Sequence, residues 1–149
     1  MRTYENQIDI DAEVAACDRC LTDPNLMQHW LNPMLHCEAV GEWSVEVGDR
    51  FRFVVNVPIL DLTLGCVVRE RREGLVVWGF DGFFIGSDRW ECLPQSDGST
   101  RLLNRFEFDI PNPLVRVGFD LVAASLTQRD MQTQLQRLKR VAETLDDFE

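Results

Sequence analysis

The sequence predicts an α+β protein in which a curved, seven-stranded antiparallel sheet wraps around a long C-terminal helix, with two short helices after the first strand. Two observations carry this prediction. Between residues 35 and 110, apolar and polar residues alternate in runs separated by Gly, Pro and Asp, which is typical of half-buried antiparallel strands. Residues 114–145 lack proline and repeat apolar residues at helical spacing, so this segment can cover one face of the sheet.

Size and charge restrict the possible partners. The chain has 149 residues, 45% of them hydrophobic, and we expect residues 1–149 to form a single domain because no repeat or linker interrupts them. Its 15 Lys and Arg against 25 Asp and Glu give a net charge of −10, which disfavours nucleic acid as a partner. Every apolar run is too short or too charged to cross a membrane, so we expect no integral membrane association.

The first 30 residues predict a strand and two short helices. Tyr4–Ile10 alternates apolar and polar side chains, as a half-buried strand does. Ala12–Leu21 then carries apolar residues at helical spacing. Asp23 suits the N-cap of a second helix, Asn25–Trp30, because Pro24 fits a first helical position.

Six further strands are expected before residue 111. Glu73-Gly74 and Ser96–Ser99 are turn signals between them. In the longest strand, Arg69 and Arg71 have the parity of the exposed face, where we expect them to pair with acidic residues of neighbouring strands. The six segments are Leu35–Val40, Phe51–Val57, Leu60–Arg72, Leu75–Phe80, Phe83–Leu93 and Arg101–Ile110.

One long helix is expected from Leu114 to Leu145. Pro111-Asn112-Pro113 ends the sheet before it. Gly118 lies inside the expected helix, where glycine costs about 1 kcal/mol relative to alanine, and leaves room for a ligand or a kink. The apolar stripe consists of Val117, Leu121, Ala124, Met131, Leu135, Leu138, Ala142 and Leu145.

The five cysteines indicate reduced thiols in a cytoplasmic protein. The start of the chain lacks the apolar core of a signal peptide. Cys17 and Cys20 have the spacing of a redox or zinc motif, but they share the apolar face of an expected helix, where free cysteine behaves as a small hydrophobe. We therefore favour core thiols over a redox or metal site, and expect no metal and no cofactor.

Several segments, in this order, resemble the helix-grip superfamily, also called START-like, birch-pollen-allergen-like or SRPBCC. The branch that the chain resembles most is that of polyketide cyclases/dehydrases and lipid-transport proteins. Asp11-Ala12-Glu13 departs from the family pattern, because the proline usual at this helix start is absent. The matching segments are Ile8–Val14, Leu21–Leu26 followed by Trp30, Gly48–Phe51, Arg89–Glu91, Asp97–Leu102 and Gln134–Leu145.

The resemblance implies a helix-grip fold with a hydrophobic pocket between the sheet and the C-terminal helix. Alternation along the strands and the expected helix face then select the side chains that would line such a pocket. The ligand-binding candidates are Phe53, Trp78, Asp88, Trp90, Asn104, Phe106, Phe108, Gly118, Leu121, Val122 and Ser125.

Two of these candidates, Asp88 and Asn104, are polar residues on otherwise apolar strand faces. A buried polar group without a partner costs about 1–3 kcal/mol, so these side chains bond each other or the backbone, or they serve the polar end of a ligand. His29 and His36 show no partner for a general base, and the sequence contains none of the common hydrolase, phosphate-binding or zinc-protease motifs.

The sequence therefore favours a protein that binds or carries a hydrophobic small molecule, such as a lipid, isoprenoid or polyketide, without catalysis. An enzyme of the cyclase, aromatase or dehydratase type using the same pocket is the alternative. An interaction module like the related chaperone activators, meeting a basic partner with its acidic surface, is a further alternative. The expected edge strand Leu35–Val40 could also pair in a homodimer.

Overall fold

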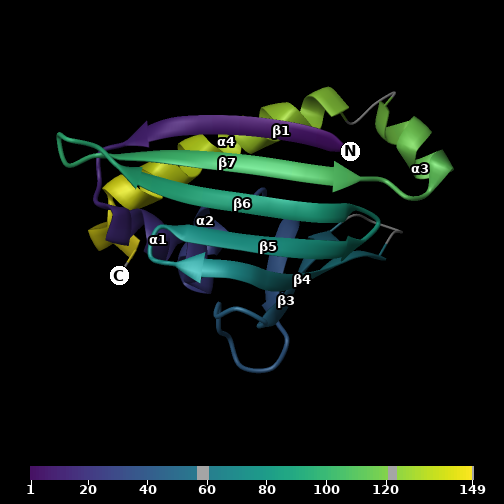
Figure 1. Cartoon of the computed structure of the whole chain (residues 1–149), viewed down its shortest axis with the longest axis horizontal. Helices are drawn as coiled ribbons and strands as arrows, with labels where there is room; N and C mark the ends of the chain where they lie inside the picture. Colours follow the sequence, from purple (N-terminus) through teal and green to yellow (C-terminus); the bar gives the residue numbers. More distant parts are fainter. Residues whose placement is uncertain (57–60, 121–123, 149) are drawn as a thin grey trace.

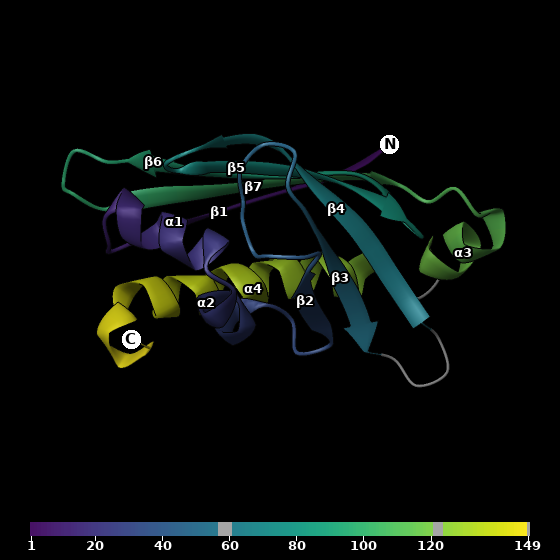
Figure 2. The same cartoon turned by 90° about the horizontal axis from the view of Figure 1, so that it is seen from below.

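The computed structural model describes residues 1–56, 61–120 and 124–148 and shows a seven-stranded sheet that curves around a helix, α4 (Figures 1 and 2). The strand order is β1-β7-β6-β5-β4-β3-β2 and every neighbouring pair is antiparallel, which confirms the predicted sheet. The strands are β1 (Arg2–Ile10), β2 (Leu35–Ala39), β3 (Arg50–Asn56), β4 (Asp61–Arg72), β5 (Leu75–Gly82), β6 (Ile85–Pro94) and β7 (Thr100–Asp109).

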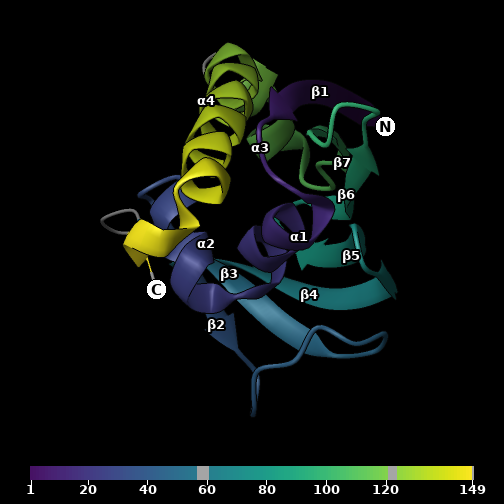
Figure 3. The same cartoon turned by 90° about the vertical axis from the view of Figure 1, so that its left-hand side faces the viewer.

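Two short helices, α1 (Val14–Thr22) and α2 (Pro24–Trp30), close one end of the molecule, as the sequence predicts (Figure 3). The Asp23 side chain caps α2 by accepting a hydrogen bond of 2.9 Å from the backbone N–H of Asn25. Trp30 at the end of α2 is fully buried, and its indole Nε1 donates to the carbonyl of Cys20 over 2.7 Å. This bond ties α2 to α1 and directs the Trp30 ring toward the sheet, where it packs on Trp90.

The single helix expected over Leu114–Leu145 is wrong. The structure has two separate helices, α3 (Pro113–Gly118) and α4 (Ala124–Glu143), and α3 lies at the end of the sheet away from α1 (Figure 2). Phe119, which follows α3, is buried against Phe84 and Phe108, with ring centroids 5.6 Å away from each. The segment is therefore held at the end of the sheet by this aromatic contact, and Val117 of the expected apolar stripe is 56% exposed.

The core lies between the inner face of the sheet and α1, α2 and α4. Cys17 and Cys20 are completely buried in it as free thiols, which confirms that they are core residues. Within the described ranges, no three His, Cys, Asp or Glu side chains gather as a metal site requires. No helix of the described part of the chain is long and apolar enough to cross a membrane.

Arg71 departs from the exposed position that strict alternation assigns to it. A bulge between Val68 and Glu70 shifts the register of β4 against β5, so that Arg71 turns toward the inner side. Its guanidinium donates two hydrogen bonds, of 2.7 and 2.8 Å, to the carboxylate of Asp18 on α1. The backbone N–H of Gly74 donates to the same carboxylate over 2.9 Å, so this buried group joins α1 to the β4–β5 turn.

Candidate functional site

A cavity lies between the inner face of the sheet and the helices α2 and α4. Its volume is about 260 Å³, whereas an apolar cavity of about 150 Å³ already holds a benzene-sized molecule. An apolar wall with a few polar groups is typical of sites for small organic molecules. The aromatic residues that line the cavity are Trp30, Phe53, Trp78, Phe80, Phe83, Phe84, Trp90 and Phe106.

Strand alternation brings these rings together on the inner face. Phe53 on β3 and Trp78 on β5 lie with ring centroids 6.1 Å apart, although β4 runs between their strands. Phe80 on β5 stacks on Phe106 of β7 over 5.3 Å. Edge-to-face and offset contacts of this kind hold rings in fixed orientations, so the wall presents defined aromatic faces to the cavity.

Asp88 is the polar residue at the centre of this aromatic wall. Asn104 Nδ2 donates to its Oδ1 over 2.7 Å, and Trp90 Nε1 donates to its Oδ2 over 2.9 Å. Burial raises the pKa of the Asp88 carboxyl to about 7, against the lowering effect of the two hydrogen bonds. Asp88 is also among the residues that line the cavity.

The helix α4 contributes a second polar group to the cavity. Asp130 and Gln134 both line it, and Gln134 Nε2 donates to Asp130 Oδ2 over 3.1 Å. Met131, between them in sequence, also lines the cavity and is 9% exposed. Met34 on the opposite wall is 47% exposed, which places it where the cavity meets solvent.

Six of the sequence-derived candidates line this cavity together, namely Phe53, Trp78, Asp88, Trp90, Asn104 and Phe106. Phe108 does not line it: this ring is fully buried between Phe84, Phe106 and Phe119. Gly118 is exposed at the end of α3, because that helix lies at the end of the sheet and not along it. Leu121 and Val122 lie outside the described residues, and so does the side chain of Ser125.

The alternatives that the sequence left open for Asp88 and Asn104 are partly resolved, because the two side chains bond each other. Asn104 also donates to the carbonyl of Arg89 over 3.2 Å. A ligand role remains compatible with this arrangement, since both residues also line the cavity.

Sequence reasoning missed the contribution of the middle of α4 and of the segment around β2. Asp130 and Gln134 flank the apolar stripe that contains Met131, so helical periodicity could have indicated them once the start of α4 was known. Trp30 carries a signal of its own, since it is the tryptophan of the family-like segment. The other missed lining residues are Leu31, Asn32, Met34, Leu35, Val55, Leu64, Phe80, Phe83 and Phe84.

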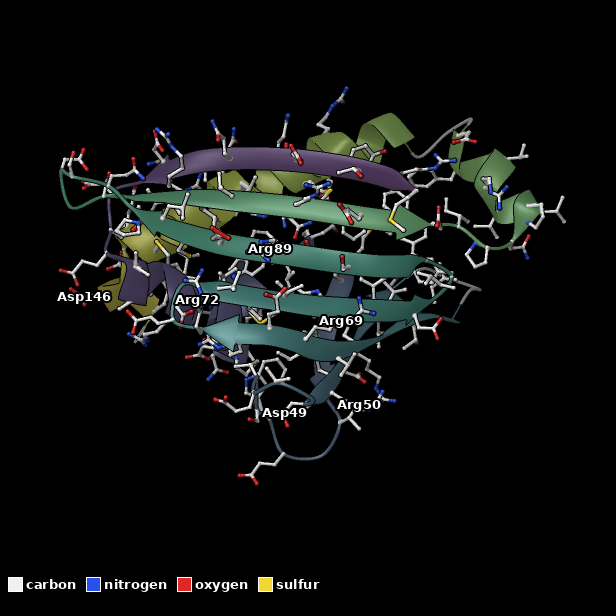
Figure 4. The ribbon with its side chains drawn as sticks, viewed as in Figure 1. Asp49, Arg50, Arg69, Arg72, Arg89 and Asp146 are labelled. Atoms are coloured by element: carbon white, nitrogen blue, oxygen red, sulfur yellow. The ribbon has the colours of Figure 1, made fainter. Side chains whose placement is uncertain are left out.

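No Lys, Arg or His of the described residues lines the cavity, although Arg137 of α4 donates a hydrogen bond of 3.0 Å to the carbonyl of Trp30, which does. Figure 4 looks onto the outer face of the sheet, opposite α4, and the labelled Arg69 and Arg89 lie on that face. Arg89 pairs there with Glu70 of β4 and with Glu91 of its own strand, and Arg52 of β3 pairs with Glu38 of β2.

The two histidines also lie elsewhere. His29 packs on the ring of Phe148 over 4.7 Å, and His36 is 63% exposed on β2 beside Glu38. Neither lines the cavity, so Asp88 and Asp130 are its ionisable groups within the described part of the chain.

Comparison with known proteins identifies a matching family and solved structures with the same fold. The model of the family described as polyketide cyclase / dehydrase and lipid transport matches residues 1–143. No curated protein sequence matches the chain.

Several solved structures share the whole fold at low sequence identity. The protein TTHA0849 from Thermus thermophilus superposes with a TM-score of 0.75 at 16% identity, over 95% of this chain and 97% of that one. A START superfamily protein from Mycobacterium smegmatis gives 0.66 at 15% identity, over 97% of both chains. The di-domain ARO/CYC StfQ of steffimycin biosynthesis gives 0.67 at 14% identity, over 97% of this chain and 46% of that protein. At these identities the similarity establishes the fold only.

Proposed function

The chain belongs to the polyketide cyclase / dehydrase and lipid transport family, and from this premise we propose that its cavity binds a hydrophobic small molecule whose polar group meets Asp88. The family and the START-like fold support a polyketide cyclase/dehydrase or a hydrophobic ligand binder. Of these two, we place binding first, because the described residues hold no histidine, lysine or arginine against the cavity that could complete a catalytic set with Asp88.

The observation that carries this proposal is an aromatic cavity of about 260 Å³ whose lining includes Asp88. A protein interior is normally packed to the density of an organic crystal, and a void of about 260 Å³ forfeits the contacts of its lining. An apolar ligand would restore those contacts. Rings such as Trp78 and Phe106 would supply the contact area, while Asp88 would orient the ligand.

Native mass spectrometry followed by organic extraction tests this proposal directly. We expect a bound hydrophobic species, or saturable binding of a neutral fluorescent apolar probe. Val55→Trp should abolish probe binding because Val55 lines the cavity, whereas its neighbour Val54 faces the other side of β3, so Val54→Trp should leave binding unchanged. An empty protein that binds no probe, or equal binding by both variants, would contradict the proposal.

One observation favours catalysis as a second candidate function. A carboxyl group with a pKa of about 7 in a cavity can both accept and donate a proton near neutral pH, as a cyclase or dehydratase acting on a polyketide requires. Asp88→Asn keeps the shape of the side chain and removes the proton transfer. If turnover of a poly-β-ketone thioester persisted in this variant with the same pH profile, Asp88 would have no catalytic role.

A further inference from the structure

We propose that the polar group recognised in this cavity is an ammonium group on an apolar ligand, aromatic or aliphatic, of about the size of one or two rings. Ligands with a carboxylate in its place are rejected. This inference rests on the proposed function and specifies its ligand class. Three features of the described residues support it, namely the charges on the cavity wall, the rings around Asp88 and the hydrogen-bond donors that Asp88 already occupies.

The charges on the cavity wall have one sign. Asp88 and Asp130 line it, and no Lys, Arg or His does so among the described residues. The side chains that the structure leaves undescribed cannot add a basic group, because residues 56–61, 121–128 and 149 contain no Lys, Arg or His. An anionic ligand would therefore meet like charge in a site of low dielectric without a counter-ion, whereas an ammonium ion meets two acceptors.

Aromatic rings flank Asp88 on both neighbouring strands. Trp78 of β5 and Phe106 of β7 are its direct cross-strand partners, and Trp90 follows two residues later on the same face of β6. Directly opposite residues in antiparallel pairs have Cβ atoms about 5 Å apart. A cation held by the Asp88 carboxylate would thus lie among these rings, and aromatic rings attract cations through their quadrupole.

Asp88 acts as a hydrogen-bond acceptor, so it suits a ligand that donates hydrogen bonds. Its two oxygens each accept one hydrogen bond, from Asn104 and Trp90, and each retains capacity for another. The donors themselves are occupied: the single N–H of Trp90 goes to Asp88, and the amide of Asn104 also donates to the carbonyl of Arg89. A carboxylate ligand placed against Asp88 would have to displace one of these bonds, whereas an ammonium ion adds to them.

Recognition of a cation by Asp88 makes binding depend on pH. Among the described residues, the ionisable group beside Asp88 is Cys66 from β4, whose own pKa is raised by burial so that its thiol stays neutral, and Asp130 from α4 lines the same cavity. Trp78, Trp90 and Phe106 from β5, β6 and β7 do not titrate in this range. Because an ammonium ion requires the ionised carboxylate, its affinity should fall as the pH falls below the pKa of about 7 of Asp88.

Three ligands with one phenyl ring and different polar groups test the inference. Displacement of a neutral fluorescent apolar probe by 2-phenylethylamine, 2-phenylethanol and 3-phenylpropanoate is measured at about pH 8 and about pH 6. At pH 8 we expect the amine to bind at least about tenfold more tightly than the alcohol, and the carboxylate most weakly. At pH 6 the advantage of the amine should shrink several-fold, while the affinity for the alcohol changes little.

Variants assign the effect to Asp88. Asp88→Asn should bring the affinity for the amine down to that for the alcohol, and retained binding of the alcohol shows that the variant is folded. Glu107→Gln removes one negative charge from the outer face, where Glu107 pairs with Arg105, and should leave all three affinities unchanged. Proton release on amine binding by the wild-type protein, measured by calorimetry at about pH 6 in buffers of different ionisation enthalpy, gives a readout that needs no variant.

The outcomes separate this inference from the proposed function. If the alcohol binds and the amine binds no more tightly, or if the carboxylate binds best, the cavity is a ligand site but the cation preference is wrong. An amine advantage that survives in Asp88→Asn also overturns the assignment to this carboxylate. If neither the probe nor any of the three ligands binds, the proposed function and this inference fail together.

Discussion

Asp88→Asn should stabilise the free protein at alkaline pH, although it replaces a residue that makes two hydrogen bonds. Burial raises the pKa of the Asp88 carboxyl from its ordinary 3.8 to about 7. The folded protein therefore holds a proton that the unfolded chain releases between these two pH values, and its free energy of unfolding falls as the pH rises through this window. A neutral amide of the same shape escapes this loss.

The size of this loss in the free energy of unfolding follows from the difference between the two pKa values of Asp88. Each pH unit between the two pKa values costs about 1.4 kcal/mol, so the ionised carboxyl lowers the free energy of unfolding by about 4 kcal/mol at pH 8. At pH 5.5, about half of this loss has occurred. The protonated carboxyl keeps acceptor capacity on both oxygens, whereas the amide nitrogen of asparagine cannot accept, so Asp88→Asn also loses one of the two hydrogen bonds; this cost is the same at both pH values. Water in the cavity would solvate the carboxylate and reduce both values.

Urea unfolding followed by tryptophan fluorescence measures the effect at about pH 5.5 and about pH 8, and avoids the isoelectric point of 4.6. The advantage of Asp88→Asn over the wild-type protein should grow by about 2 kcal/mol between the two pH values. Asp9, Asp97 and Asp120 do not interfere, because their hydrogen bonds lower their pKa values and their contributions are lost only in more acidic solution. Glu107→Gln controls for the change in net charge.

A variant whose stability relative to the wild-type protein is the same at both pH values would refute this reasoning. It would show that the Asp88 carboxyl ionises as freely in the folded protein as in the unfolded chain. The cavity would then be hydrated well enough to remove the desolvation of the carboxylate, and the pH dependence inferred for ligand binding would fail with it.

Three other substitutions test contacts elsewhere in the fold. Gly86→Ala should lower the free energy of unfolding by about 3 kcal/mol or more, because its Cβ would lie 1.9 Å from the carbonyl oxygen of Glu107, as thermal or urea unfolding can check. Gly118→Ala, whose Cβ would meet nothing within 4 Å, should instead raise it by up to about 1 kcal/mol in the same assay. Asp18→Asn leaves buried Arg71 without its counter-ion and should cost about 3 kcal/mol; an unchanged urea midpoint would show that the pair contributes little.

Local patterns determine most of this fold. The alternation of side chains places Phe51, Phe53, Leu102 and Asn104 on the inner face of the sheet, and the structure has them there, all nearly or fully buried. The predicted strand limits differ from the observed ones by a few residues at most. Pleated strands have a period of two whatever surrounds them, so this part of the structure can be read from the chain alone.

The failures occur where a tertiary contact overrides the local pattern. Val117 continues the apolar stripe of α4 in sequence, yet Phe119, which is outside that stripe, provides the buried contact with Phe84 and Phe108. Likewise, the bulge in β4 places Arg71 opposite Asp18 of α1, and single-strand parity cannot anticipate an extra residue. Both errors arise because the deciding partner is distant in sequence.

Only part of the candidate site could be predicted, because its other residues come from distant positions in the sequence. Strand parity identified Asp88 as a polar residue among apolar ones, but its environment depends on Trp78 from one neighbouring strand and Phe106 from the other. Asp130 approaches from α4, more than 40 positions along the chain, and its place at the cavity depends on where that helix begins. Sequence identified the unusual residue, and the structure supplied the surroundings that determine its charge.

The identity of residue 88 supports the ligand site that we propose. A leucine there would fill space, remove the cost of an ionised buried carboxyl and fit the apolar face of β6, so stability alone does not explain an aspartate. Two further side chains, Asn104 and Trp90, direct their donors at its oxygens and so fix the orientation of the carboxylate. A carboxylate held in one orientation and destabilised by its surroundings gains most from a bound cation, because the cation offsets the desolvation that the free protein bears.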